Sequence, residues 1–198
     1  MSDRLLYLIR HAPVTLLPDR PAPEWPLTGE GRALAERLAE APVWRNLELV
    51  ASSPEAKALN TAEPIAAAAG LTVRIEEELR EVRREGTPVV GWEAYKAMVA
   101  AFFASPGQSV HGWEPGGVAR QRIVSCINRL LAETQGSLAL VSHGLILSLY
   151  LASLTGLDIP NLEEWAAIPL PAVAIVDPSV GRVVAPFVSV EGFLEGFR

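Results

Sequence analysis

Residues 5–11 have the sequence LLYLIRH, and this stretch decides how the chain folds. Its first five residues are continuously apolar, which is typical of a short strand buried on both faces of a parallel sheet. The apolar run ends abruptly at Arg10 and His11, so we expect both side chains at the C-terminal tip of the strand. Ligands of parallel α/β sheets bind beyond the carboxyl ends of strands, and this tip is therefore the first candidate for a functional site.

Further strands and helices alternate along the rest of the chain. Ser52-Ser53-Pro54 predicts a capped helix start with the proline at its first position, and Thr28 lies at or just before an earlier helix start. The charged run from Glu76 to Glu85 is expected to be largely solvated. Strands are expected at residues 47–51, 71–75, 137–141, 172–176 and 182–188, and helices at residues 31–40, 54–69, 92–103, 117–131 and 143–154.

This alternation predicts a three-layer α/β/α fold with a mostly parallel central sheet. The length of 198 residues fits a single domain over residues 1–198, with a helical and loop insertion at about residues 86–115. The apolar tail from Phe187 to Phe197 could pack on this domain or pair with a second chain to form a homodimer.

Composition excludes several classes of partner. The formal net charge of −6 and the pI of about 5.2 argue against a broad surface for nucleic acid or anionic lipid. The single cysteine, Cys126, lies in an amphipathic segment and is expected to be a core thiol in a reducing compartment. No apolar run approaches a signal-peptide core or the roughly 20 residues of a membrane span. The sequence predicts a soluble, cytoplasmic protein without nucleic-acid or membrane partners.

Two histidines occupy equivalent places in the chain. His11 directly follows the first strand, and His143 follows the strand at residues 137–141 with only Ser142 between. If these strands are neighbours in a parallel sheet, both imidazoles emerge at one edge. The Arg10 guanidinium suits phosphate oxygens, and free backbone amides are expected where a helix starts at Gly144. Together these groups favour a shared anion site over two structural histidines.

A third cation can reach the same edge. Lys57 lies near the N-terminal end of the helix that follows Ser52-Ser53-Pro54, although a solvated helix residue would explain it equally well. The chain has no Gly-rich phosphate loop, dinucleotide fingerprint or serine-hydrolase elbow. One cysteine and three histidines also offer too few convincing ligands for zinc. We therefore expect no metal and no cofactor.

Four motifs, in chain order, resemble those of the histidine phosphatase (phosphoglycerate-mutase-like) superfamily. Residues 8–12 (LIRHA) resemble its Arg-His-Gly signature, and residues 26–31 (PLTGEG) resemble its Leu-Thr-x-x-Gly segment. Ser52-Ser53-Pro54 with Ala58, Thr61 and Ala62 resembles its Ser-Ser-Pro…Arg-Ala…Thr-Ala helix. Residues 141–144 (VSHG) match its second histidine motif.

The resemblance implies a metal-independent phosphomonoesterase that acts on a small phosphorylated metabolite through a phosphohistidine. His11 would attack phosphorus and His143 would assist it. The phosphate oxygens would be held by basic, amide and hydroxyl groups at Arg10, Lys57, His143, Gly144 and Thr15.

The resemblance also implies an acid that protonates the leaving alcohol and later activates water. In many members it follows the third strand, a position that Glu81 matches best, with Glu78 and Glu85 as alternatives. Because acidic residues crowd this segment, a solvated surface role for Glu81 stays open.

The sequence departs from the family pattern at several places. Ala12 replaces the usual glycine, Lys57 replaces the usual arginine, and Val118 stands where the acid of a Pro-Gly-Gly-Glu segment is expected, although Arg122 fits. No dedicated site for a second anion is apparent, which argues against a phosphoglycerate-type mutase. That mutase and a catalytically weakened phosphate-binding or interaction module on the same fold remain the alternatives.

Specificity is expected to come from residues 86–115 and from the proline-rich loop after His11. His111 could contact a leaving group, but a surface histidine explains it better. Arg83 and Arg84 could recognise a second anionic group or be solvated. Three tryptophans could form an apolar lid over the substrate or pack in the core, namely Trp92, Trp113 and Trp165.

Overall fold

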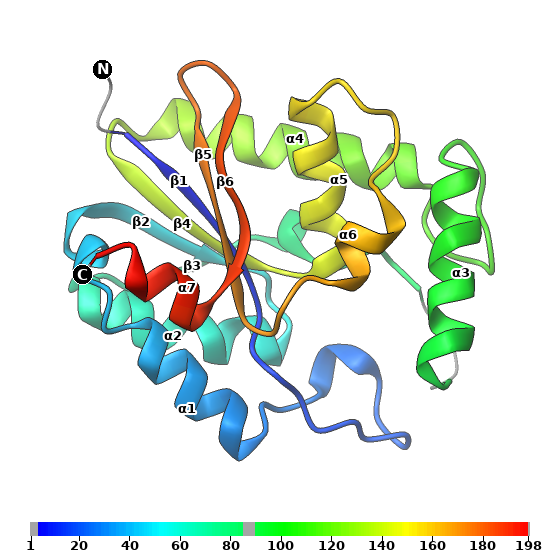
Figure 1. The fold of residues 1–198 in the computed structure, drawn as a ribbon, viewed down its shortest axis with the longest axis horizontal. Helices are drawn as coiled ribbons and strands as arrows, with labels where there is room; N and C mark the ends of the chain where they lie inside the picture. Colours follow the sequence, from blue (N-terminus) through cyan, green and yellow to red (C-terminus); the bar gives the residue numbers. More distant parts are fainter. Residues whose placement is uncertain (1–3, 85–89, 198) are drawn as a thin grey trace.

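The structure is a computed structural model that describes residues 4–84 and 90–197. Glu85 and the beginning of the predicted insertion at Gly86 lie outside these ranges. Within them, six strands form one sheet in the order β3-β2-β4-β1-β5-β6 (Figure 1). The strands are β1 (Leu6–Arg10), β2 (Leu47–Ser52), β3 (Val73–Ile75), β4 (Ser137–Ser142), β5 (Ala172–Asp177) and β6 (Arg182–Ser189).

The sheet is mixed and mostly parallel, as predicted. β1 pairs with β4, β4 with β2, and β2 with β3, all in parallel. β5 is antiparallel to both of its neighbours, β1 and β6. The carboxyl ends of β1, β4 and β2 therefore meet at one edge.

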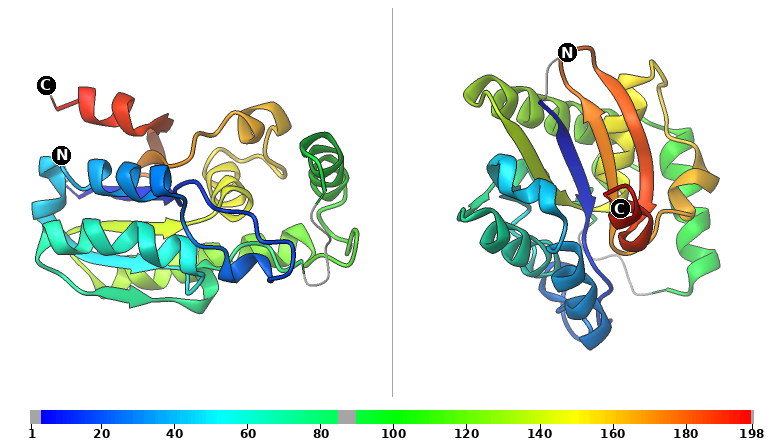
Figure 2. Two further views of the ribbon diagram at one scale, coloured as in Figure 1. Left: turned by 90° about the horizontal axis from the view of Figure 1, so that it is seen from below. Right: turned by 60° about the vertical axis from the view of Figure 1, so that its left-hand side comes forward.

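Helices cover both faces of this sheet (Figure 2). The α-helices are α1 (Gly29–Leu38), α2 (Ala56–Ala69), α3 (Trp92–Ala104), α4 (Gly116–Glu133), α5 (Gly144–Leu154), α6 (Leu162–Ala166) and α7 (Val190–Glu195). Short 3-10 helices lie at Ala22–Glu24, Pro42–Asn46 and Glu77–Leu79. The sequence analysis did not predict α6 and α7, because five- and six-residue helices are too short to show an apolar period.

Alternation along β1 divides the core into two parts. Leu6 and Leu8 belong to a cluster that includes buried residues of α4 and α5, whereas Tyr7 and Ile9 belong to a cluster with residues of α2 and α7. Successive side chains of a strand point to opposite faces, and here both faces are covered. This explains why residues 5–9 are apolar without interruption, and it confirms the three-layer α/β/α architecture.

Two helix starts show how local chemistry positions the chain. Thr28 caps α1, and its side chain accepts a hydrogen bond from the Gly31 amide. The prediction that Pro54 begins the next helix is wrong, because α2 begins at Ala56 with Glu55 as its N-cap residue. The Ser53 hydroxyl accepts from the Glu55 amide at 3.3 Å and also lies 2.8 Å from His143 Nε2. Ser53 thus belongs to the site at the sheet edge.

The expectation that residues 76–85 are largely solvated is also wrong for the part that the structure describes. Glu76, Leu79, Glu81 and Val82 are buried. Glu76 lies 2.6 Å from Arg74 Nε and 2.7 Å from Arg129 Nη2, which satisfies its charge. Burial of Glu76 therefore depends on the cations of Arg74 and Arg129.

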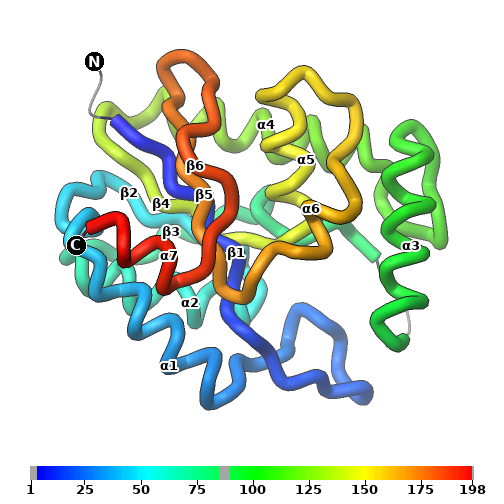
Figure 3. Tube along the Cα trace, viewed as in Figure 1, coloured from blue at the N-terminus to red at the C-terminus, as the bar shows by residue number. Residues whose placement is uncertain are grey.

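The apolar tail packs on the domain. Phe193 of α7 stacks on Trp44 with ring centroids 5.2 Å apart and meets the edge of Tyr7 at 6.2 Å. Figure 3 follows the chain from β1 into the proline-rich loop and back into α1. No helix among residues 4–84 and 90–197 is long and apolar enough to cross a membrane.

Candidate active site

The two histidines singled out in the sequence face each other at the carboxyl ends of β1 and β4. Arg10 is in register with Ser142, and the His11 amide donates to the Ser142 carbonyl at 3.0 Å. The imidazole ring centroids of His11 and His143 are 5.2 Å apart in an edge-to-face arrangement. Pairing of the two strands thus brings both rings to one place.

His11 presents an unprotonated nitrogen. Its Nδ1 lies 2.8 Å from the carbonyl oxygen of Ala12, and because a carbonyl only accepts, Nδ1 carries the hydrogen. Burial lowers the pKa of His11 well below its usual 6.5, and nearby His143, Lys57 and Arg10 lower it further. The ring is therefore neutral at pH 7, and Nε2 keeps the lone pair that a nucleophile needs.

Ala12 fits this position without backbone strain. In the described ranges, His111 is the one non-glycine residue with a positive φ, so the glycine conformation is not required at Ala12. The Ala12 amide donates to Thr61 Oγ1 at 3.0 Å. Ala12 is fully buried in a small cluster with Leu27 and Ala35.

His143 is fully buried behind His11. Its Nε2 lies 2.8 Å from Ser53 Oγ and 3.4 Å from Glu55 Oε1. Burial lowers the pKa of His143 well below 6.5, and the positive charges of Lys57, Arg84 and Arg10 act in the same direction. His143 is thus a second neutral imidazole, oriented by the segment that follows β2.

Arg10 lies against the first residue of α5. Its Nη1 donates to the Ile168 carbonyl at 2.5 Å. A Cβ atom built on Gly144 would lie 3.2 Å from Arg10 Nε and 3.3 Å from Arg10 Cζ. The missing side chain of Gly144 therefore makes room for the guanidinium.

Lys57 is close to the histidines but already has a carboxylate partner. Its Nζ lies 2.5 Å from Glu55 Oε2 and donates to the Ala22 carbonyl at 2.8 Å. Glu55 Oε1 accepts from the Glu81 amide at 3.0 Å. Burial lowers the pKa of Lys57, and the charge of Glu55 opposes this effect. A buried carboxylate thus neutralises one of the predicted phosphate ligands.

Glu81 lies at the start of α5. Its carboxylate accepts from the amides of Leu145 at 3.1 Å and Ile146 at 2.9 Å. The expectation of free amides at this helix start is therefore wrong for these two residues, because Glu81 occupies them. Glu78 instead is half-exposed with its carboxylate 3.5 Å from Arg129. Of the predicted acids within the described ranges, Glu81 is the one that bonds the backbone just after His143 and Gly144.

The segment that carries Glu81 is held by Arg122 of α4. Its guanidinium pairs with Glu114 at 2.8 Å and donates to the carbonyls of Glu78 at 2.5 Å and Arg80 at 3.0 Å. Glu114 in turn accepts from the Arg83 amide at 3.2 Å. This buried ion pair therefore fixes the backbone on both sides of Glu81.

Two predicted contacts are not brought to the histidines. Thr15 is exposed in the proline-rich loop, where its amide donates to the Pro26 carbonyl at 2.9 Å. Among the described residues, no hydrogen bond joins the Thr15 hydroxyl to the cluster. His111 is exposed, with a φ of 55°, and its ring meets the edge of Trp113 at 6.2 Å.

An aromatic wall flanks the site; it consists of Trp92, Tyr95, Trp113 and Trp165. Trp92 stacks on Trp165 at 5.7 Å, and Tyr95 lies 6.1 Å from Trp113 and 5.9 Å from Trp165. Arg84 donates to the Tyr95 hydroxyl, and its Cζ lies 5.1 Å from the centre of the Tyr95 ring. Trp113 and Trp165 are buried, whereas Trp92 is half-exposed.

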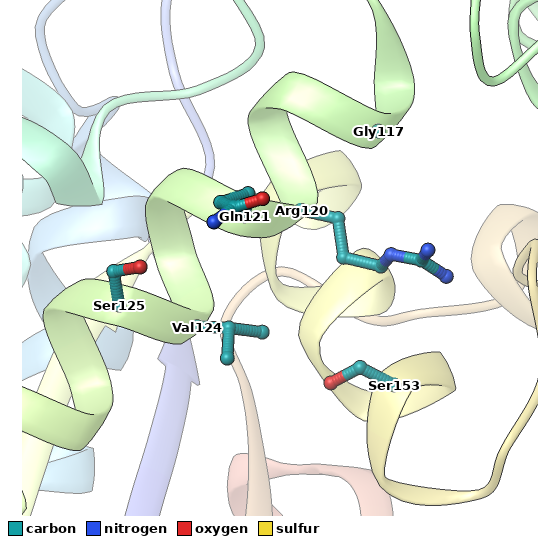
Figure 4. A pocket seen from close by; sticks show the side chains of 6 residues that line it. All are labelled: Gly117, Arg120, Gln121, Val124, Ser125 and Ser153. Atoms are coloured by element: carbon teal, nitrogen blue, oxygen red, sulfur yellow. The ribbon is translucent and has the colours of Figure 1, made fainter.

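Two other features lie away from the histidines. Glu76, Glu78 and Cys126 could together hold a metal ion, but Glu76 is already paired with Arg74 and Arg129. A hollow between α4 and α5 is lined mostly by α4, and its one α5 residue, Ser153, lies roughly 14 Å along the helix from Gly144. Its lining residues are Gly117, Arg120, Gln121, Val124, Ser125 and Ser153 (Figure 4).

The sequence analysis missed several residues of the site. Glu55 gave one signal, a carboxylate two residues before Lys57 at a helix start, but nothing in the sequence indicated that it is buried. Trp165 was named as a lid or core residue, but nothing in the sequence indicated that its N–H lies near Arg10 at Gly144. The Arg122–Glu114 pair joins residues eight positions apart whose common role appears only when α4 packs beside the Glu81 segment.

Comparisons with known proteins identify one family. The model of the histidine phosphatase superfamily (branch 1) matches residues 6–186. No curated protein matches the chain significantly. A mycobacterial glucosyl-3-phosphoglycerate phosphatase solved with inorganic phosphate is 21% identical, with a TM-score of 0.75, over 95% of this chain and 99% of that chain.

Two further solved structures share the fold. Bacillus stearothermophilus YhfR is 22% identical, with a TM-score of 0.70, over 94% of this chain and 98% of that chain. A putative alpha-ribazole-5'-P phosphatase from Escherichia coli K-12 is 21% identical, with a TM-score of 0.70, over 93% of this chain and 96% of that chain. Since the family model spans nearly the whole chain and the histidine motifs meet at one sheet edge, this protein belongs to the histidine phosphatase superfamily, branch 1.

Proposed function

We propose that this protein is a phosphomonoesterase that hydrolyses a small phosphorylated metabolite through a phosphohistidine on His11, without a metal. The observation that carries the proposal is the state of His11. Its Nδ1–H is bound to the Ala12 carbonyl, its ring is neutral, and His143 lies opposite with a centroid distance of 5.2 Å. A neutral imidazole of fixed tautomer at the edge of a sheet is a nucleophile ready for phosphorus.

In the first step, Nε2 of His11 attacks phosphorus, and the P–N bond forms as the ester P–O bond breaks. Arg10 balances the charge on the phosphoryl oxygens, Lys57 adds the part of its charge that Glu55 leaves, and His143 supplies a hydrogen bond. Glu81, in its protonated form, gives its proton to the leaving alcohol. The alcohol departs neutral, and His11 carries the phosphoryl group.

In the second step, water attacks the phosphohistidine. The Glu81 carboxylate takes the proton of that water, a new P–O bond forms, and the P–N bond breaks. Inorganic phosphate leaves, and His11 and Glu81 return to their starting states. The cycle consumes one ester and one water and releases one alcohol and one phosphate, and every proton passes through Glu81.

The structural relatives support the phosphate-binding part of this proposal. One of them is a phosphatase solved with inorganic phosphate, and another is described as a putative phosphatase of a 5'-phosphate. The substrates named for these two proteins differ, so they support the reaction class and leave the metabolite open. We expect the exposed part of the aromatic wall, Trp92, to contact the leaving group.

The test is hydrolysis of p-nitrophenyl phosphate between about pH 5 and 8, with and without a chelator. The parent protein is compared with His11→Ala and with His111→Ala, which changes an exposed histidine. We expect turnover that survives the chelator, disappears in His11→Ala and persists in His111→Ala. Quench in alkaline detergent should trap a ³²P-labelled protein adduct, stable in base and labile in acid, in the parent and in His111→Ala but not in His11→Ala.

Two results would contradict the proposal. Turnover retained in His11→Ala would exclude the phosphohistidine. Saturable binding of vanadate by a parent without turnover would show the weakened binding module that the buried Glu55–Lys57 pair makes conceivable.

A further inference from the structure

Three buried polar side-chain atoms have no hydrogen-bond partner in the described part of the chain, and all three lie at the candidate active site. They are Arg10 Nε, His143 Nδ1 and Trp165 Nε1. Buried polar groups are nearly always paired, and an unpaired one destabilises the fold. Their gathering at one place indicates a ligand that supplies the missing partners.

Arg10 and Trp165 approach the same point. A Cβ atom built on Gly144 would lie 3.2 Å from Arg10 Nε and 3.3 Å from Trp165 Nε1. Both nitrogens are donors, so neither can satisfy the other. Only an acceptor that enters beside Gly144 can satisfy both groups, and an anionic oxygen does so best.

The indole of Trp165 is held so that its N–H stays in this direction. Trp165 lies in α6, whose start is capped by the Asn161 side chain. Its ring stacks on Trp92 with an interplanar angle of 18° and meets the edge of Phe103 at 6.3 Å. Only 3% of Trp165 is exposed, so its N–H cannot turn to solvent.

Two other tryptophans show what a purely structural indole does in this protein. Trp44 Nε1 donates to the Leu38 carbonyl at 2.7 Å, and Trp25 Nε1 donates to the Leu17 carbonyl at 2.9 Å. Trp44 is as deeply buried as Trp165, yet its N–H is paired within the core. Packing therefore explains why the Trp165 ring is buried, but it does not explain why its N–H points where no protein group accepts it.

We propose that Trp165 is a phosphate-binding residue whose Nε1–H donates to the same phosphoryl group as Arg10. This inference rests on the proposed phosphatase function and adds to it a neutral donor from α6. A rigid, water-excluded N–H gains strength as charge grows on the phosphoryl oxygens during transfer. It also gives the phosphoryl group a further donor at a site where Glu55 already balances the charge of Lys57.

The test uses Trp165→Phe, which keeps an aromatic ring and removes the N–H. Dissociation constants for inorganic phosphate and vanadate are measured by calorimetry, beside the KM and kcat for p-nitrophenyl phosphate. We expect both dissociation constants to rise roughly tenfold to hundredfold, as for loss of one hydrogen bond to a charged group. The melting temperature without ligand should fall less than in a variant that loses a paired N–H, because Trp165→Phe removes ring atoms but no hydrogen bond.

Trp44→Phe is the matched control. It removes an indole N–H that is paired with Leu38, so it should lower the melting temperature and leave phosphate affinity within about twofold. In the parent, the ¹⁵N-labelled indole resonance that Trp165→Phe removes should move downfield when phosphate is added. A structural role alone would not shift that resonance.

The outcomes separate this inference from the proposed function. If the parent turns over substrate but Trp165→Phe binds phosphate as tightly as the parent, the inference is overturned and the phosphatase stands. An indole resonance that ignores phosphate has the same meaning. If the parent neither binds phosphate nor hydrolyses the ester, both are overturned.

Discussion

Glu55 and Lys57 form a buried ion pair inside the candidate active site, with Glu55 Oε2 2.5 Å from Lys57 Nζ. Glu55 Oε1 is also 3.4 Å from His143 Nε2. Under the proposed function, an incoming phosphoryl group would meet a lysine whose charge is already balanced, and a carboxylate that repels it. The pair makes Glu55 a determinant of phosphate affinity.

Glu55→Gln should strengthen phosphate binding. The amide oxygen can still accept from the Glu81 backbone, but the negative charge is gone and Lys57 is released toward the ligand. We expect the dissociation constant for vanadate to fall roughly tenfold, since one charge is removed from a buried site. Calorimetry checks this, with Glu163→Gln as a control that breaks only the exposed pair with Lys96. Equal affinity in parent and variant would show that Glu55 does not restrain Lys57.

Lys57→Met should destabilise the protein more than Lys57→Met combined with Glu55→Leu. Removing one partner of a buried pair leaves an uncompensated charge, which lowers the free energy of unfolding by about 3–5 kcal/mol. Replacing both partners removes that charge and should restore most of the loss. Denaturant unfolding of the parent, of Lys57→Met, of Glu55→Leu and of the double variant gives the coupling energy. If the decreases in the free energy of unfolding of the two single variants add up to that of the double variant, the two side chains do not interact directly.

Glu81→Gln should slow hydrolysis of alkyl phosphates far more than that of p-nitrophenyl phosphate. An alkoxide must be protonated as it leaves, whereas p-nitrophenolate leaves without help, so only the first reaction needs the acid. We expect a loss of roughly 10²- to 10⁴-fold in kcat for the alkyl ester. Glu78→Gln is the control, because its half-exposed carboxylate lies beside Arg129. Equal losses for both ester types would indicate a structural role for Glu81.

Gly144→Ala should weaken phosphate binding while the protein stays folded. The new methyl group would lie 3.2 Å from Arg10 Nε, so the guanidinium must shift by a few tenths of an ångström. Misplacing one bidentate ligand should raise the KM for p-nitrophenyl phosphate roughly tenfold. Gly29→Ala adds the same methyl group with nothing within 4 Å and should leave the KM unchanged. If the two variants behave alike, the close approach to Arg10 is irrelevant to binding.

The free energy of unfolding should decrease as the pH falls below about 6.5. Burial lowers the pKa values of His11 and His143 in the folded protein, whereas in the unfolded chain both titrate near 6.5. Below that pH the unfolded state binds protons that the folded state does not, so each histidine removes up to about 1.4 kcal/mol per pH unit. The contribution of each histidine to the free energy of unfolding is fully present above pH 6.5. It is lost as the pH falls toward the pKa of that histidine in the folded protein.

Urea unfolding across this pH range measures the slope in the parent, in His11→Asn and in the control His111→Asn. His11→Asn should give a shallower slope because one buried titrating group is gone. His111 is exposed, so its replacement should leave the slope of the parent. Identical slopes in all three proteins would show that burial of His11 does not control the acid stability.

The sequence by itself determined the sheet and the meeting of the histidines. An uninterrupted apolar run at residues 5–9 and another within residues 137–141 can be buried only as central strands, and parallel pairing then places His11 and His143 at one edge. The start of α1 after Thr28 and the end of α2 before Gly70 could also be predicted from the sequence. A hydroxyl cap and a left-handed glycine each act within one helical turn. The prediction that a helix begins at Pro54 is wrong. The Ser53 hydroxyl contacts His143 and does not cap α2, which begins at Ala56.

Only the tertiary structure decided which charged and polar residues are buried. Glu81 is buried because it accepts the amides of Leu145 and Ile146, and the segment before it is held by Arg122. Glu55 is buried because Lys57 neutralises it, and the Trp165 N–H faces Arg10 because α6 packs beside α5. Apolar periodicity is a property of neighbouring residues, whereas the burial of a charge depends on a partner that the folded chain brings from elsewhere.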